Sequence, residues 1–193
     1  MKRTLALVLT LACASPAGAQ AAPARDNVAS ATTATDGAYV SDFAWDVTRQ
    51  SGGDVDQLNS ATAEARCTDC GATAIAFQVV LVSGPSGSLT PHNRAVAVND
   101  QCTRCVVAAE ARQFVRVVDE PVKFTGAGMQ QLADIRQDLR GLARANLSVA
   151  DLHAAVERDE ARVLDVMAHE VVPKADPEGA VQGRAARVLE ASG

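Results

Sequence analysis

Apolar and polar residues alternate with the period of a β-strand through much of the first 120 residues. Phe43, Trp45 and Val47 share one parity, whereas Asp42 and Asp46 have the other. Successive side chains of a strand point to opposite faces, so this alternation predicts a strand that is buried on one side. The segment also contains the only tryptophan of the chain.

The period changes to that of a helix near the C-terminus. Apolar residues recur every three or four positions from Met129 to Ala145, and Asn146 ends the pattern. A second helix is predicted from Ser148, with Asp151 three residues later in a start that resembles a capping box, and it ends at Pro173. The short connection predicts an antiparallel helical hairpin over 129–173.

An internal duplication is the strongest signal in the chain. A shift of 35 residues places Cys67-Thr68-Asp69-Cys70 over Cys102-Thr103-Arg104-Cys105, and eight of the sixteen positions from Cys67 to Val82 are identical. After the cysteines the identities fall on every second residue, which indicates one common face of a strand. The other face differs between the copies. It is apolar in the first copy, which predicts a strand covered on both sides, and largely charged in the second, which predicts one solvent-exposed side. The two sets are Ile75, Phe77, Val79 and Leu81, and Glu110, Arg112, Phe114 and Arg116.

Each copy therefore consists of a strand, a Cys-x-x-Cys corner and a second strand. We expect an α+β fold in which the two units and the strand at Trp45 form a small, mostly antiparallel sheet of about five strands, followed by the helical hairpin. Alanines on the common face predict a close approach to the other copy or to the helices. Gln78 and Gln113, in the middle of that face, are expected to pair across a pseudo-two-fold axis.

The N-terminus resembles a secretory signal peptide. Lys2 and Arg3 precede a short apolar segment, and small residues offer cleavage sites after Ala19 or Ala21. Attachment of a lipid at Cys13 is an alternative, although a large aliphatic residue is missing three places before it. The organisation predicted for the chain is a signal peptide (1–21), a flexible spacer (22–37), the duplicated β domain (38–118), a linker (119–128), the hairpin (129–173) and a disordered tail (174–193).

Composition limits the classes of partner. The 193-residue chain has a formal charge of -5, a pI near 5.2 and only 3% aromatic residues. An acidic chain without a basic cluster is not expected to bind nucleic acid or an anionic membrane. The N-terminal apolar run is too short to span a bilayer, so no transmembrane segment is expected after cleavage.

The paired Cys-x-x-Cys motifs allow three chemistries. Removal of the signal peptide leaves Cys67, Cys70, Cys102 and Cys105, and an even number in an exported chain favours two disulfides. Three pairings are possible, and bridges between the copies would close the longest loops. A structural zinc site with the same four ligands is one alternative. Thiol–disulfide exchange is the other, although each motif precedes an alternating segment instead of the helix that lowers the pKa of a redox-active thiol.

Other catalytic patterns are missing from the sequence. His169-Glu170 has Pro173 where the helical zinc-protease motif requires a second histidine. The sequence has no P-loop or dinucleotide fingerprint. We therefore expect a protein that is not an enzyme and that needs no cofactor.

The duplicated part of the chain resembles a small exported module of high-GC Gram-positive bacteria. The resemblance is carried by the segment from Phe43 to Asn59, by the first corner with the strand that follows it, and by the second copy with its Gln113-Phe114-Val115. This module also occurs appended to putative peptide zinc metalloproteases, whose protease part has no counterpart here. The resemblance covers about residues 43–118 and implies a location outside the cytoplasm. The sequence thus predicts a secreted, disulfide-stabilised module that binds an unidentified protein or cell-envelope partner.

Overall fold

The computed structural model describes residues 26–174 of the chain. The predicted signal peptide 1–21, Cys13 and all but the first residue of the predicted tail 174–193 lie outside the described residues. The elements, in chain order, are β1 (Asn27–Thr33), β2 (Tyr39–Ala65), β3 (Gly71–Asn99), β4 (Val106–Val118), β5 (Val122–Phe124), α1 (Gly126–Arg144), α2 (Val149–His169) and β6 (Val171–Pro173).

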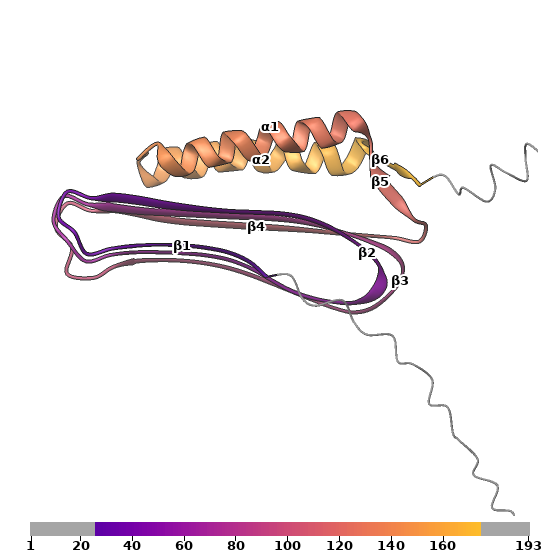
Figure 1. Cartoon of the computed structure of the whole chain (residues 1–193), viewed down its shortest axis with the longest axis horizontal. Helices are drawn as coiled ribbons and strands as arrows, with labels where there is room; N and C mark the ends of the chain where they lie inside the picture. The colour runs from indigo at the N-terminus through magenta and orange to yellow at the C-terminus, as the bar shows by residue number, and fades with distance from the viewer. Residues whose placement is uncertain (1–25, 175–193) are drawn as a thin grey trace, which may run out of the picture.

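The first four strands wind into a flat, two-layered parallel β-solenoid. β2 and β3 each run along one layer, bend back and return along the other (Figure 1). Glycines with positive φ lie at the bends, where L side chains are strained: Gly52, Gly53 and Gly84. The lower layer consists of β1 and residues 55–65 and 89–99, and the upper layer of residues 39–51, 71–83 and β4. We call the three turns of the chain coils. The first coil consists of β1 and residues 39–51, the second of residues 55–65 and 71–83, and the third of residues 89–99 and β4.

The sheet is parallel throughout, so the prediction of a mostly antiparallel sheet is wrong. Its strand order is β1-β2-β3-β4, and each strand pairs in parallel with the same position of the next coil, as Ala74 does with Ala109. The two strands of each repeated unit lie in different layers and do not pair with each other. Repeats are therefore related by translation along the solenoid, not by a pseudo-two-fold axis. Among the described residues only β5 and β6 pair antiparallel.

A third copy of the unit lies in the segment that was expected to be a flexible spacer. β1 occupies 27–33 of the range 22–37, and its Asn27 pairs with Asn59 of the second coil. The signal was present in the sequence. Asn27, Asn59 and Asn93 are each followed by alanines two and four residues later. This copy has Thr35-Asp36-Gly37 in place of a cysteine corner, so the search for paired cysteines missed it.

The common face of the repeats points into the solenoid. Alanines there allow the two layers to approach closely, and Ala61, Ala74 and Ala76 are fully buried. The close approach predicted for these alanines is therefore between the layers of the solenoid.

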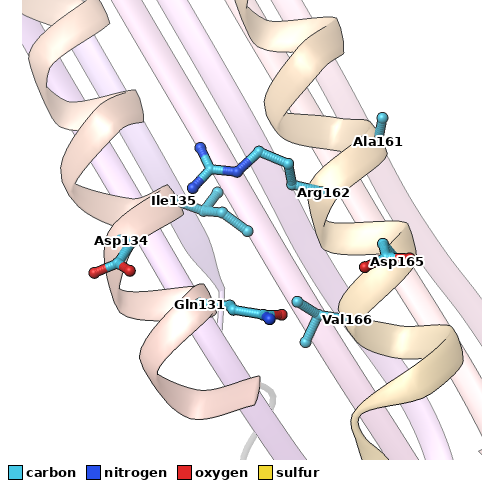
Figure 2. Close-up of a pocket in the computed structure, with 7 residues that line it drawn as sticks. All are labelled: Gln131, Asp134, Ile135, Ala161, Arg162, Asp165 and Val166. Carbon is cyan, nitrogen blue, oxygen red and sulfur yellow. The ribbon is translucent and has the colours of Figure 1, made fainter. Parts of the chain in front are cut away.

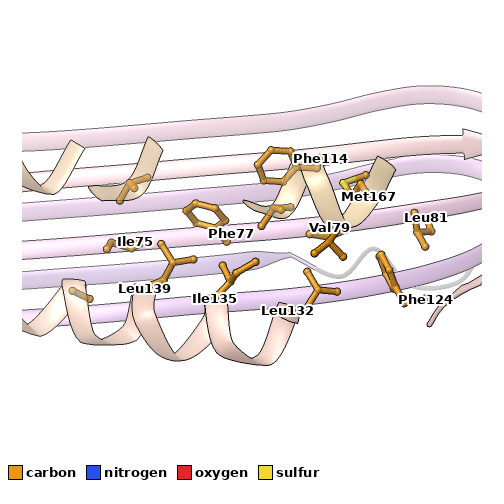
Figure 3. Close-up of a cluster of buried hydrophobic side chains, with 14 of the residues drawn as sticks. Ile75, Phe77, Val79, Leu81, Phe114, Phe124, Leu132, Ile135, Leu139 and Met167 are labelled. Carbon is orange, nitrogen blue, oxygen red and sulfur yellow. The ribbon is translucent and has the colours of Figure 1, made fainter. Parts of the chain in front are cut away.

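The opposite face of the upper layer is covered by the two helices, both of which the periodicity predicts. Figure 3 shows large apolar side chains of β3 against those of α1 and α2. This cluster includes Ile75, Phe77, Val79, Leu81, Leu132, Ile135, Leu139 and Met167. The first part of β3, which was expected to be covered on both sides, is therefore covered by the lower layer on one side and by the two helices on the other.

Both helices have an N-cap residue with a side-chain hydroxyl. The Thr125 hydroxyl accepts a hydrogen bond from the Gly128 N–H, and the Ser148 hydroxyl accepts one from the Asp151 N–H. Each cap satisfies a donor that the first helical turn leaves unpaired. Within residues 26–174, neither helix combines the length and apolar character needed to cross a membrane.

Candidate functional site: the four-cysteine corner

Both Cys-x-x-Cys motifs form corners between the lower and upper layers, at the same edge of the solenoid. Disulfides link Cys67 to Cys70 and Cys102 to Cys105, with Cα–Cα distances of 6.0 and 5.9 Å. These distances lie in the usual range for a disulfide. Of the three pairings that the sequence left open, the structure thus has the one within each motif, and no bridge joins the two coils.

Parallel stacking places one corner directly on the other. Thr68 and Thr103 form a parallel bridge, and the Asp69 N–H donates to the Thr103 carbonyl at 2.9 Å. As a result the Cys70 sulfur lies 3.2 Å from that of Cys105, and all four sulfurs lie within 4.8 Å of one another. The duplication thus brings together in space two motifs that are 35 residues apart.

The same four sulfurs match the ligand set of a zinc ion. A tetrahedral site with zinc–sulfur bonds of about 2.3 Å has sulfur–sulfur distances of about 3.8 Å, and Cys70 and Cys102 are 3.8 Å apart. Opening both disulfides would require each bonded sulfur to move by only about 1 Å to reach this arrangement. Cys67 and Cys70 are buried and the other two cysteines half-buried, as in a closed structural site.

The surroundings of the sulfurs do not favour thiolates. Backbone carbonyl oxygens face them: that of Cys67 lies 3.0 Å from the Cys105 sulfur, and that of Thr33 lies 3.7 Å from the Cys67 sulfur. A carbonyl oxygen repels a negative charge, whereas a reactive thiolate is stabilised by a cation or a helix N-terminus. Each corner leads into a strand, so neither motif lies at the start of a helix.

Both arginines next to the cysteines are already paired, and Arg66 contacts Glu64 at 2.6 Å and Asp100 at 3.2 Å. The Arg104 guanidinium donates two hydrogen bonds to the carboxylate of Asp69, which occupies the same position in the preceding repeat. This contact lowers the pKa of Asp69 and raises the pKa of Arg104. Both side chains are exposed, so the pair contributes to the register of the corners more than to stability.

An amide ladder runs through the middle of the interior, several residues along the strands from the corner. Asn27 Nδ2 donates to Asn59 Oδ1 at 2.7 Å, and Asn59 Nδ2 donates to Asn93 Oδ1 at 2.8 Å. Gln113 Nε2 donates to Gln78 Oε1 at 2.8 Å. The two glutamines therefore pair with each other, as predicted, but as neighbours in a parallel stack and not across a two-fold axis. Such ladders align equivalent residues of successive coils and so fix the register.

A charged seam joins β4 to α2, which corrects the prediction that β4 has one solvent-exposed side. Arg112 contacts Glu110 at 2.9 Å and Glu160 at 2.6 Å, and His153 Nδ1 lies 2.9 Å from the Glu110 carboxylate. Glu110 is only 8% exposed. Its hydrogen bond, assisted by the Glu157 charge, raises the pKa of His153. The charged residues of β4 thus face a helix and not solvent.

A shallow groove of about 440 Å³ runs between the two helices. Figure 2 shows its lining residues on both helices, with the strands behind them. Arg162 of α2 contacts Asp138 of α1 and Asp159 of its own helix at 2.6 Å each, and burial raises the pKa of Asp159. The bridge ties α1 to α2, so these charges act in helix packing.

Comparisons with protein families, with curated proteins and with solved structures find no match to this chain. The functional assignment therefore depends on the geometry of the chain itself.

Proposed function

We propose that this protein is a secreted, non-catalytic interaction module whose solenoid is stabilised by a disulfide in each of its two cysteine corners. The N-terminal pattern of basic, apolar and small residues supports export, where cysteines are kept oxidised. Its partner is another protein chain or a component of the cell envelope.

The main support for a non-catalytic role is the environment of the four sulfurs. Carbonyl oxygens of Thr33 and Cys67 face the sulfurs. The arginines beside the cysteines are held by acidic side chains, Arg66 by Glu64 and Asp100 and Arg104 by Asp69. A redox enzyme needs an attacking thiol with a lowered pKa, which a helix N-terminus provides, whereas each corner here leads into a strand. The disulfides therefore act as structural links within the corners.

A structural zinc site is the second candidate. It is favoured by one observation, the clustering of Cys67, Cys70, Cys102 and Cys105 within 4.8 Å. It requires all four sulfurs to be reduced, so the two candidates exclude each other in any one molecule. The oxidation state of the isolated protein decides between them.

Alkylation and peptide mapping of the isolated protein test the proposal. Trypsin cleaves after Arg66 and Arg94, so one peptide contains Cys67 and Cys70 and no other cysteine. We expect all four thiols to be blocked before reduction, and this peptide to carry an internal disulfide without a linked partner. Four free thiols with one bound zinc ion per chain would establish the second candidate instead.

An activity assay tests the remaining possibility, thiol–disulfide exchange. We expect no catalysed reduction of a model disulfide such as that of insulin, with either the wild type or a Cys67→Ser/Cys70→Ser variant. Catalysis that disappears in this variant, while the Cys102→Ser/Cys105→Ser variant folds to the same extent, would contradict a non-catalytic role.

A further inference from the structure

The interior of the solenoid is open at the end formed by the third coil. Leu89 and Val117 occupy inward-facing positions, next to the fully buried Val55 and Val82, but are 44% and 40% exposed. Ala95 and Ala97 are likewise exposed, although the alanines at the same positions of the second coil are fully buried. We call these four residues, with the free edges of β4 and 89–99, the open end.

Of the two edges of the open end, β4 lacks the usual protecting residues, whereas 89–99 contains one proline, Pro91. β4 is 13 residues long and contains no proline and no lysine. Repeat proteins usually end in a unit that covers the core with polar residues, and long unprotected edges pair with other strands. The edge N–H and C=O groups of β4, and those of 89–99 apart from Pro91, therefore make a site for further strands.

A second copy stacked head-to-tail does not fit this site. Three strands repeat after about 14 Å, whereas two helices packed side by side occupy about 18–20 Å. The α1–α2 pair is therefore wider than the layer beneath it. Translation by one protein would drive the α2 helix of one copy into the α1 helix of the next.

We propose that the open end pairs with the open end of a second copy, about a two-fold axis parallel to the strands. This rotation exchanges the upper and lower layers, so β4 of each copy lies beside 89–99 of the other. The two strands run in opposite directions because the chain reverses between layers, and they pair antiparallel. The helices come to lie on opposite faces, and α2 extends over strand 89–99 of the second copy without collision.

The rotation also determines the register. Asn93 Nδ2 donates to the Ala111 carbonyl at 3.0 Å within one chain, so these residues are level along the strands. A two-fold axis along the strands keeps that position, which places Asn93 opposite Ala111 of the second copy. Antiparallel pairing then sets Leu89 against Val115 and Ala95 against Ala109.

This register is chemically consistent on both faces. On the inner face, Leu89 with Val115 and Ala95 with Ala109 form apolar pairs that continue the interior across the junction. Between them, Asn93 lies opposite Ala111 and Pro91 opposite Gln113, where the amides of the interior reach the junction. On the outer face, Arg94 lies directly opposite Glu110 of the second copy. Glu110 is buried at the seam with α2, and opposite charges facing each other across strands stabilise their pairing. The two-fold axis makes each such contact twice.

The area is sufficient for a stable dimer. Thirteen residues of β4 span about 43 Å, and the two layers with their outer side chains are about 15 Å deep. The junction would bury about 650 Å² per copy, or about 1,300 Å² in total, which is within the range of specific interfaces. The inference is independent of the proposed corner chemistry, because either state of the cysteines leaves the open end unchanged.

Sedimentation of the full chain over a range of concentrations tests the proposal. We expect a monomer–dimer equilibrium, with no species larger than a dimer. Arg94→Glu places like charges opposite each other and should weaken the dimer about tenfold. The matched control is Arg49→Glu, the same change on an exposed residue of the first coil, which should leave the dimer unchanged. A chain that remains monomeric at all concentrations, open-ended polymers, or equal effects of the two variants would overturn the proposal.

Cysteine cross-linking tests the register directly. In an Arg94→Cys/Glu110→Cys variant the two new thiols lie on opposite outer faces of one chain but face each other across the junction. We expect oxidation to give a covalent dimer linked through residues 94 and 110. An Arg94→Cys/Arg116→Cys control, whose second thiol lies about 20 Å further along β4, should not be linked. Equal cross-linking of both variants would exclude this register.

Discussion

The two ends of the solenoid have the same backbone but are completed in opposite ways. At the first coil, Asp42 and Asp46 occupy inward-facing positions and are half-buried; Asp42 accepts a hydrogen bond from the Ser30 N–H at 2.7 Å, and Asp46 accepts one from the Thr48 hydroxyl. At the third coil, the position equivalent to Asp42 is Ala109.

Inward-pointing charges on an edge strand prevent pairing with other strands. The first coil is therefore a closed end and the third coil an open one. The comparison teaches that the residues at two inward positions of the edge strand, Asp42 and Asp46 at one end and Ala109 and Gln113 at the other, distinguish a closed end from an open one.

The largest effect is expected when this difference is removed. Ala109→Asp gives the open end the carboxylate of the closed end. A charge in an apolar junction is costly unless it is paired, so the dissociation constant of the dimer should rise at least about 100-fold. Sedimentation measures this change. The free energy of unfolding of the dilute monomer should barely change, because water reaches the new side chain. A dimer of unchanged affinity would contradict the assignment of the open end.

A matched pair of alanines compares the interior at the two ends. Ala29 and Ala95 occupy equivalent positions, but only Ala29 is fully buried. Ala29→Leu should lower the free energy of unfolding by about 1–3 kcal/mol through overpacking. Ala95→Leu should change it by less than about 0.5 kcal/mol. Urea denaturation at concentrations below dimer formation gives both values, and equal losses would show that the ends are alike.

The polar closure itself should make a smaller contribution. Asp42→Ala removes the acceptor for the Ser30 N–H and should cost about 1 kcal/mol of unfolding free energy. Asp56→Ala, at an aspartate that is 74% exposed, is the control for loss of one negative charge and should be close to neutral. The same denaturation assay applies, and an Asp42 variant as stable as the control would remove the basis for a closed end.

The smallest expected effect is on the pH dependence of stability. It comes from the charged seam between β4 and α2, which has no equivalent at the closed end. His153 has a raised pKa in the folded protein, chiefly through Glu110. Its stabilising contribution is therefore fully present below the unfolded-state pKa of about 6.5 and is lost as the pH rises through the higher folded-state value. The melting temperature of the wild type, relative to His153→Gln, should fall between pH 6 and pH 8.5. A difference that does not depend on pH would show that this contact is not made.

Strand periods, corners and helices could be predicted from the sequence, but the direction of strand pairing could not. The alternation from Ala74 to Val82 and the match of the corners show which residues share a face, and both hold in the structure. A strand, a corner and a second strand form an antiparallel hairpin only if the two strands pair with each other, and the sequence prediction assumed that they do. Whether they pair or separate into two layers depends on contacts between repeats, and periodicity is the same in both cases.

The site was partly predictable for a similar reason. Both cysteine motifs were found, but the proximity of Cys70 to Cys105 follows from parallel stacking and could not be inferred without it. Arg112 was expected on a solvent-exposed face because charges at alternate positions are typical of one. Its partner Glu160 lies in a helix 48 residues away, which no local pattern shows. The repeated asparagines were a usable signal for the first coil, since their register is visible in the sequence.

Amide hydrogen exchange of the full chain tests the contrast between the ends most directly. In dilute solution, β1 should exchange slowly and strand 89–99 quickly, although both are edge strands of the lower layer. At concentrations where the dimer forms, 89–99 should become protected while β1 remains unchanged. Equal protection of the two strands at every concentration would contradict a solenoid with one closed and one open end.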